Sequence, residues 1–206
     1  MGIFVKISTV FWRFHFYPAV IAAVCLTLLF PFFFGIENAS FIQSAEIYER
    51  FFPLISVLLF LPLYLPDSNE EATALIRTKR FSYVKILVLR LIQILCSLFL
   101  MTCGCLLIFD KSNAVVEFNH FLLSGMADAL FMGGLYAIGF AFTAQPVIGL
   151  ILPLGYYVAC LFTGDKYLKI FYLFSLIKND MASKYVLLTS GILLILFSIL
   201  LMERRK

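Results

Sequence analysis

Charged residues are scarce in this sequence, and their scarcity excludes a soluble domain. Only 14% of the 206 residues are Asp, Glu, Lys or Arg, against about 25% in typical soluble proteins, while 63% are hydrophobic. No stretch outside the apolar runs is long enough to bury a core of its own. The sequence therefore predicts an all-α integral membrane protein with a single transmembrane domain over residues 1–206.

Motifs of catalysis and cofactor binding are also missing. The chain has no G-x-x-x-x-G-K-[ST] phosphate loop, no G-x-S-x-G elbow and no H-E-x-x-H zinc motif. His15 and His120 have no neighbouring ligand type, and the five cysteines all fall in apolar runs, where we interpret them as structural. We therefore predict no catalytic, cofactor-binding or metal-binding residue. Because the basic residues sit at membrane edges, no nucleic-acid partner is expected either.

Apolar runs predict six transmembrane helices, because each is long enough to cross a bilayer at about 1.5 Å per residue. They cover about residues 14–34, 49–66, 83–109, 120–144, 147–163 and 185–202. Residues 1–13 are amphipathic and predict a helix at the inner interface. Residues 35–50 are interpreted as a polar outer link. Residues 164–184 contain an apolar core too short to span and are interpreted as an interfacial or re-entrant segment before the sixth helix.

The positions of Lys and Arg predict the orientation. Six spans place both termini on one side, and the segments assigned to that side hold nine Lys and Arg against six on the other. Basic residues favour the cytoplasmic side. The prediction is a multi-pass protein of the plasma (inner) membrane with both termini in the cytoplasm.

The polar stretch between the second and third spans separates its charges by sign. Acidic residues come first and basic ones follow: Asp67, Glu70 and Glu71, then Arg77, Lys79, Arg80 and Lys85. Residues 69–78 contain no Gly or Pro, and Asp67 or Ser68 would suit an N-cap. This pattern favours a short helix under the bilayer that could transmit a movement of a soluble partner to the membrane helices. An ordinary positive-inside loop is the alternative.

Two charged residues and a row of small ones stand out inside the spans. Asp128 is a candidate functional residue because an acid in a membrane is costly. Arg90 is its possible partner, although Arg90 is also near enough to the inner face to snorkel, and Asp128 could lie hydrated near the outer headgroups. Small residues recur every fourth position, which lets another helix approach closely: Gly125, Ala129, Gly133, Ala137 and Ala141.

The layout resembles the type-2 ABC transporter permeases, a family of six-span subunits. Its cytoplasmic coupling helix carries acidic residues and leads into a pattern like L-x-x-T-x-P-x-S, followed by a basic residue early in span three. Glu70, Glu71, Leu75, Thr78, Ser82 and Arg90 stand at those positions, with Arg80 where the family has Pro. The amphipathic start, the tight Gln145-Pro146 turn and the segment before span six are also similar to that family.

The resemblance implies a permease that is not itself an enzyme. ATP and Mg²⁺ would be held by separate ABC ATPase subunits that dock on residues 67–82, with Lys79 and Arg80 among the docking residues. A second permease copy or a homologous permease would complete the assembly in the lipid. Spans one, two and five would line the path of a hydrophobic, lipid-like or peptide substrate, and the resemblance implies an exporter.

Two alternatives stand beside the permease. Glu70-Glu71 invites comparison with intramembrane hydrolases of the CAAX-protease type, although Leu75 occupies the place of the Arg in their EExxxR motif. A membrane assembly factor without transport activity is the other.

Overall fold

A computed structural model describes residues 9–68 and 83–204 of the chain. These residues form a helical bundle without strands, and six helices are long and apolar enough to cross a membrane. They run over Thr9–Phe34, Phe41–Asp67, Tyr83–Lys111, Phe118–Thr143, Pro146–Thr163 and Met181–Arg204. The expected all-α architecture with six helices of membrane-spanning length is confirmed.

Proline interrupts the first two of these helices. A π-helical turn, η1 (Trp12–Phe16), leads into α2 (Tyr17–Phe34), which has Pro18 in its first turn. α3 (Phe41–Phe60) gives way to two 3₁₀ turns, η2 (Leu61–Leu63) and η3 (Leu65–Ser68), and Pro62 lies at the start of η2. Proline cannot donate the backbone hydrogen bond that an α-helix needs, which is consistent with a change of helix type next to Pro18 and at Pro62, although α2 and α3 continue through Pro31 and Pro53.

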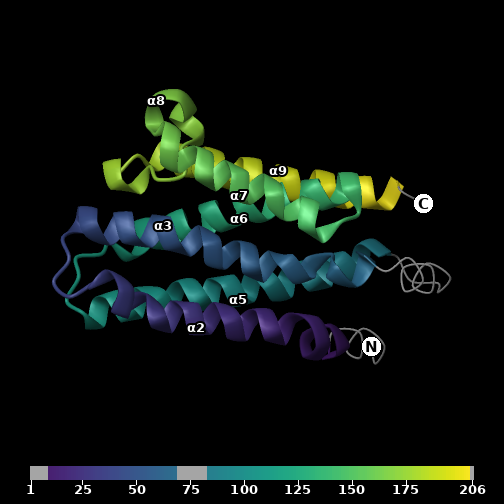
Figure 1. The fold of residues 1–206 in the computed structure, drawn as a ribbon, viewed down its shortest axis with the longest axis horizontal. Coiled ribbons are helices and arrows are strands. Elements are labelled where there is room, and N and C mark those ends of the chain that lie inside the picture. The colour runs from purple at the N-terminus through teal and green to yellow at the C-terminus, as the bar shows by residue number, and fades with distance from the viewer. Residues whose placement is uncertain (1–8, 69–82, 205–206) are drawn as a thin grey trace.

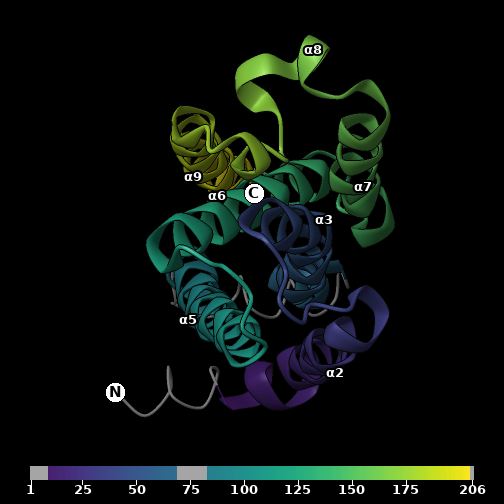
Figure 2. The same ribbon diagram turned by 90° about the vertical axis from the view of Figure 1, so that its left-hand side faces the viewer.

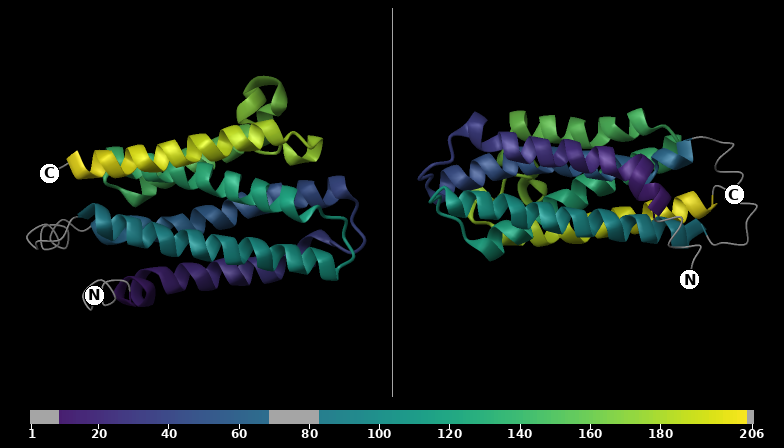
Figure 3. Two further views of the ribbon diagram at one scale, coloured as in Figure 1. Left: turned by 180° about the vertical axis from the view of Figure 1, so that it is seen from behind. Right: turned by 90° about the horizontal axis from the view of Figure 1, so that it is seen from below.

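The other four long helices are α5 (Tyr83–Lys111), α6 (Phe118–Thr143), α7 (Pro146–Thr163) and α9 (Met181–Arg204). Figure 1 shows both ends of the chain at one end of the bundle, together with the points where η3 stops and α5 begins. We call this end the terminal face. The opposite end, the loop face, carries the links α2–α3 and α5–α6 and the segment between α7 and α9, as the two further views in Figure 3 also show.

α6 is the central helix. Seen end-on in Figure 2, it has α7 and α9 on one side and α3 and α5 on the other, with α2 at the far edge. Glycines permit the close approaches. A Cβ at Gly134 would lie 2.9 Å from the carbonyl oxygen of Gly191 in α9, and one at Gly139 would lie 2.9 Å from the Cα of Gly149 in α7. Such contacts leave no room for a larger residue.

The row of small residues on α6 includes two positions pressed against α3. A Cβ at Gly125 would fall 1.9 Å from the hydroxyl of Tyr48, and one at Gly133 would fall 2.3 Å from the ring of Phe60. The alanines of the row are all buried: Ala129, Ala137 and Ala141. Two aromatic side chains of α3 therefore occupy the space that small residues leave on α6.

The second long helix begins earlier than expected. α3 starts at Phe41, so the polar outer link assigned to residues 35–50 is wrong from Phe41 onward. A capping box explains the start, because Gln43 accepts a hydrogen bond from the backbone N–H of Ser40 at 3.0 Å. The polar residues that follow lie on the helix, where Glu46 and Arg50 form an exposed i,i+4 ion pair.

Two other boundaries differ from the sequence-based expectation. The described part of the predicted interfacial helix, Thr9 onward, is continuous with the first long helix; residues 1–8 lie outside the described part. The sixth long helix begins at Met181, so Lys184 belongs to it and not to the preceding link. That link contains three short helical turns: α8 (Asp165–Leu168), η4 (Lys169–Phe171) and η5 (Leu176–Lys178).

Candidate functional site

A lysine is completely buried near the start of α9, where it meets carboxylates from two other helices. The Nζ atom of Lys184 lies 2.5 Å from Oε1 of Glu49 on α3 and 2.8 Å from Oδ1 of Asp128 on α6. It also donates a hydrogen bond to the carbonyl oxygen of Leu173, which precedes η5. An ammonium group has three N–H donors, and these three residues accept from all of them. We call Glu49, Asp128 and Lys184 the loop-face cluster.

Glu49 ties the link between α7 and α9 to α3. One of its carboxylate oxygens accepts the backbone N–H of Leu176 at 2.8 Å, and the other accepts that of Ile177 at 3.4 Å. Ser124 of α6 adds a hydroxyl contact at 3.3 Å. Backbone N–H groups at the start of a helical turn suit an anionic acceptor. η5 is thus held by a side chain more than a hundred residues away in sequence.

Asp180 positions the lysine from the other direction. Its carboxylate accepts a hydrogen bond from the Ser183 hydroxyl at 2.6 Å, and the Ser183 backbone N–H lies 3.5 Å away. These bonds lower the pKa of Asp180, which is exposed at the loop face, because they stabilise its ionised form. The residue acts as an N-cap for α9. It sets where α9 begins and therefore where Lys184 enters the bundle.

The environment of Asp128 corrects two expectations. Its side chain is 1% exposed, so it does not lie hydrated among outer headgroups. Its cation is Lys184, whose Nζ is 2.8 and 2.9 Å from the two carboxylate oxygens, and not Arg90. Ser124, one helical turn earlier on α6, lies 3.5 Å from Oδ2. Asp128 stands out in the sequence as an unusual residue, but the prediction that Arg90 is its partner is wrong.

Arg90 forms a second buried ion pair near the terminal face. Its Nη1 donates to Oδ2 of Asp67 at 2.6 Å and to the carbonyl oxygen of Leu63 at 3.1 Å. The guanidinium carbon also lies 5.3 Å from the centre of the Phe11 ring. Because Arg90 is only 4% exposed, the expectation that it snorkels outward is wrong. We call Asp67 and Arg90 the terminal-face pair.

The terminal-face pair fixes the turns that end the second long helix. Two tyrosines hold the same turns: Tyr136 of α6 donates to the carbonyl oxygen of Leu61 at 2.8 Å, and the hydroxyl of Tyr64 lies 2.9 Å from that of Ser198 on α9. The residues just before position 69 are therefore anchored to α5, α6 and α9 at once.

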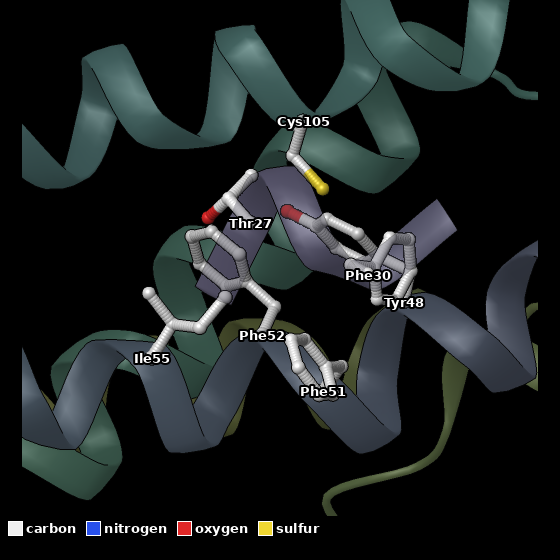
Figure 4. Close-up of a pocket in the computed structure, with 7 residues that line it drawn as sticks. All are labelled: Thr27, Phe30, Tyr48, Phe51, Phe52, Ile55 and Cys105. Carbon is white, nitrogen blue, oxygen red and sulfur yellow. The ribbon is translucent and has the colours of Figure 1, made fainter. Parts of the chain in front are cut away.

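A narrow apolar gap lies between the described helices α2, α3 and α5. Figure 4 shows side chains of these helices packed around one gap, with the Tyr48 hydroxyl pointing toward Cys105. The gap is too narrow for a water molecule and is lined by Thr27, Phe30, Tyr48, Phe51, Phe52, Ile55 and Cys105. Stacking of the Tyr48 and Phe52 rings at 5.1 Å indicates that this region is packing, not a binding site.

Of the predicted site residues, the structure describes Arg90, Asp128 and the small residues of α6, and it places Arg90 and Asp128 in separate sites. The predicted docking residues lie outside the described part: Glu70, Glu71, Leu75, Thr78, Lys79, Arg80 and Ser82. The described residues include no group of three or more His, Cys, Asp or Glu that could hold a metal ion.

Sequence reasoning missed Glu49 and Lys184 as site residues: Glu49 falls where the polar link 35–50 meets the expected second span, and Lys184 ends the expected interfacial or re-entrant segment. A signal was present for both. Glu49 shares the buried face of α3 with Ala45 and Phe52, at helical spacing, and Lys184 shares a buried face of α9 with Leu187. A charged residue on the apolar face of a helix predicts a buried partner.

Comparisons of the chain with protein-family models, with curated proteins and with solved structures find no match.

Proposed function

We propose that the chain is the permease subunit of an ATP-driven ABC-type transporter in the plasma (inner) membrane. ATP and Mg²⁺ would be bound by separate ATPase subunits, and a second permease copy or a homologous permease would complete the membrane part. The substrate class that suits this assembly is a hydrophobic, lipid-like or peptide molecule carried outward. The six helices of membrane-spanning length and the layout of the links support this proposal.

The observation that carries the proposal is the pair of buried anchors on the second long helix. Glu49 anchors it to α9 and to η5 at the loop face, and Asp67 anchors it to α5 at the terminal face. Residues 69–82 follow Asp67 and Ser68 directly and precede α5. A helix fixed at both ends transmits a displacement along its length. A displacement of residues 69–82 would therefore be transmitted to the segment between α7 and α9 at the loop face.

The arrangement of the helices supports the same mechanism. Figure 2 shows α2, α3 and α7 along one side of the bundle, which suits a path lined by the first, second and fifth spans. ATP-driven closure of two ATPases would move residues 67–82 as a lever, and the membrane dimer would alternate between inward- and outward-facing states. The bias of Lys and Arg toward the segments assigned to the side of both termini supports a cytoplasmic position for the lever.

The geometry gives less support to an intramembrane hydrolase. His120 is the histidine downstream of Glu70-Glu71, and it lies near the start of α6, at the loop face, 2.6 Å from Glu117. Asp67, which precedes Glu70 by three residues and Glu71 by four in the sequence, lies at the terminal face. The described positions of His120 and Asp67 therefore do not favour a site that this histidine would share with the acids that follow Asp67.

Charge reversal on the lever tests the proposal. Glu70→Lys with Glu71→Lys should leave membrane insertion unchanged, because acidic residues contribute little to orientation. The complex should lose its ATP-binding subunit, identified by mass spectrometry, or lose ATP-dependent transport, because an attractive contact has become repulsive. The matched control is Glu37→Lys with Asp110→Lys, two exposed acids at the loop face. The proposal is wrong if the lever variant keeps its ATPase and transports like the parent and like the control.

A further inference from the structure

The loop-face cluster contains one more acid than base. Glu49 and Asp128 each carry a negative charge when ionised and Lys184 carries one positive charge, which would leave a net charge of −1. All three side chains are at most 1% exposed. An uncompensated charge in such surroundings is strongly unfavourable, and a carboxyl group avoids it by taking up a proton.

Among the described residues, Lys184 is the cation that the structure shows in contact with both Glu49 and Asp128. The other titratable groups that interact with Asp128 include Tyr48 on α3 and Tyr156 and Cys160 on α7, and all three are neutral when protonated. Arg90 pairs with Asp67 at the other end of the bundle. A proton within the cluster would balance the remaining charge.

The hydrogen-bond donors around Ser124 lead to the same conclusion. Its Oγ lies 3.3 Å from Oε1 of Glu49 and 3.5 Å from Oδ2 of Asp128. A hydroxyl has a single proton and cannot donate to both carboxylates. One added proton on Oδ2 of Asp128 resolves the conflict, because Asp128 then donates to Ser124 and Ser124 donates to Glu49.

The other acid is the poorer place for that proton. Glu49 accepts two backbone N–H groups from η5 as well as the Lys184 ammonium. Donors of this kind favour an ionised carboxylate. Nζ of Lys184 lies 2.8 Å from Oδ1 and 2.9 Å from Oδ2 of Asp128, and the bond to Oδ1 persists when Oδ2 carries the proton.

We propose that Asp128 is a buried proton-binding site, protonated at neutral pH and hydrogen-bonded through Ser124 to the ionised Glu49. The step is a simple proton transfer: Oδ2 of Asp128 accepts a proton from hydronium in the bulk solvent, which leaves a water molecule, and the cluster becomes neutral. Loss of this proton at alkaline pH leaves the cluster at −1. Water must then enter to solvate it, and η5 detaches, because Glu49 and Lys184 both hold that link. The site is independent of whether the chain transports anything.

Infrared difference spectroscopy of the purified protein in ester-free detergent tests the proposal. At pH 7 the parent should show the C=O stretching band of a protonated carboxyl, shifted in D₂O, and Asp128→Asn should abolish it. Ser124→Ala should keep the band at higher frequency, because the acid loses its acceptor. A parent without the band, or a band that Asp128→Asn leaves unchanged, overturns the proposal. A parent spectrum without the band overturns the proposal even where a variant fails to fold.

Hydrogen exchange measures the consequence. Backbone exchange in residues 172–180 should accelerate about tenfold or more, beyond the intrinsic pH effect, when the parent is taken to alkaline pH. Asp128→Asn, which mimics the protonated acid, should show only the intrinsic effect. Equal acceleration in the parent and in Asp128→Asn contradicts the link between the proton and η5.

Discussion

The two buried charge sites on the second long helix use the same elements but differ in balance. The terminal-face pair joins one acid to one base, 23 residues apart in sequence. The loop-face cluster joins two acids to one base and also holds backbone groups of a link 127 residues from Glu49. A neutral pair is sufficient to fix a helix end. The additional acid at the loop face is the feature to which we attribute the proposed proton-binding role.

The largest expected effect comes from removing the cation of the loop-face cluster. Lys184→Met removes the cation that contacts both Glu49 and Asp128, which should lower the free energy of unfolding by about 3–5 kcal/mol. Unfolding in detergent micelles measures the loss. Lys166→Met, at an exposed lysine of α8, is the control and should have little effect.

A variant with a neutral loop-face cluster distinguishes the contribution of charge to the free energy of unfolding from that of packing. Adding Glu49→Gln and Asp128→Asn to Lys184→Met should recover a good part of the loss, because neutral side chains are cheaper to bury. If the triple variant is no more stable than Lys184→Met alone, the cost does not come from the unpaired carboxylates.

A smaller loss is expected at the terminal-face pair. Arg90→Met leaves one buried carboxylate, that of Asp67, without the Arg90 cation. Because this pair lies near the end of the bundle, the free energy of unfolding should fall by about 3 kcal/mol. Asp67→Asn in the same background should reduce that loss. A loss as large as that of Lys184→Met would mean that the balance of charge does not distinguish the two sites.

The smallest effect concerns the contact between α3 and α6, which lies between the two sites. Gly133→Ala places a methyl group into the ring of Phe60 and should cost roughly 1–3 kcal/mol of unfolding free energy. Gly155→Ala on α7 is the matched control, because a Cβ there meets nothing within 4 Å. Equal effects of the two changes would show that this contact can relax.

The long helices could be predicted because runs of apolar residues determine them directly. Their boundaries were less certain, since local hydrogen bonds set them: the capping box at Ser40 and Gln43 extends α3 into a polar stretch, and Asp180 starts α9 before Lys184. Because these polar stretches were interpreted as segments between the spans, Glu49 and Lys184 were not recognised as buried site residues.

The pairing of buried charges could not be predicted in the same way. Asp128 and Arg90 are both recognisable as unusual, but which cation meets which acid depends on how the helices pack. Lys184 and Asp128 are 56 residues apart in the sequence. Arg90 instead pairs with Asp67, which lies 23 residues before it, at the start of the polar stretch between the second and third spans. Helix packing depends in turn on small residues such as Gly191, where α9 comes close to α6.

Hydrogen exchange in two single variants tests the central claim, that the two sites anchor opposite ends of the same helix to different segments. Glu49→Gln weakens charge-assisted bonds worth about 1.5–3 kcal/mol, so exchange in residues 172–180 should accelerate about tenfold or more. Exchange in residues 61–67 should stay unchanged. Asp67→Asn should do the reverse. Acceleration of both peptides by either variant, or of neither peptide by Glu49→Gln, would contradict the account.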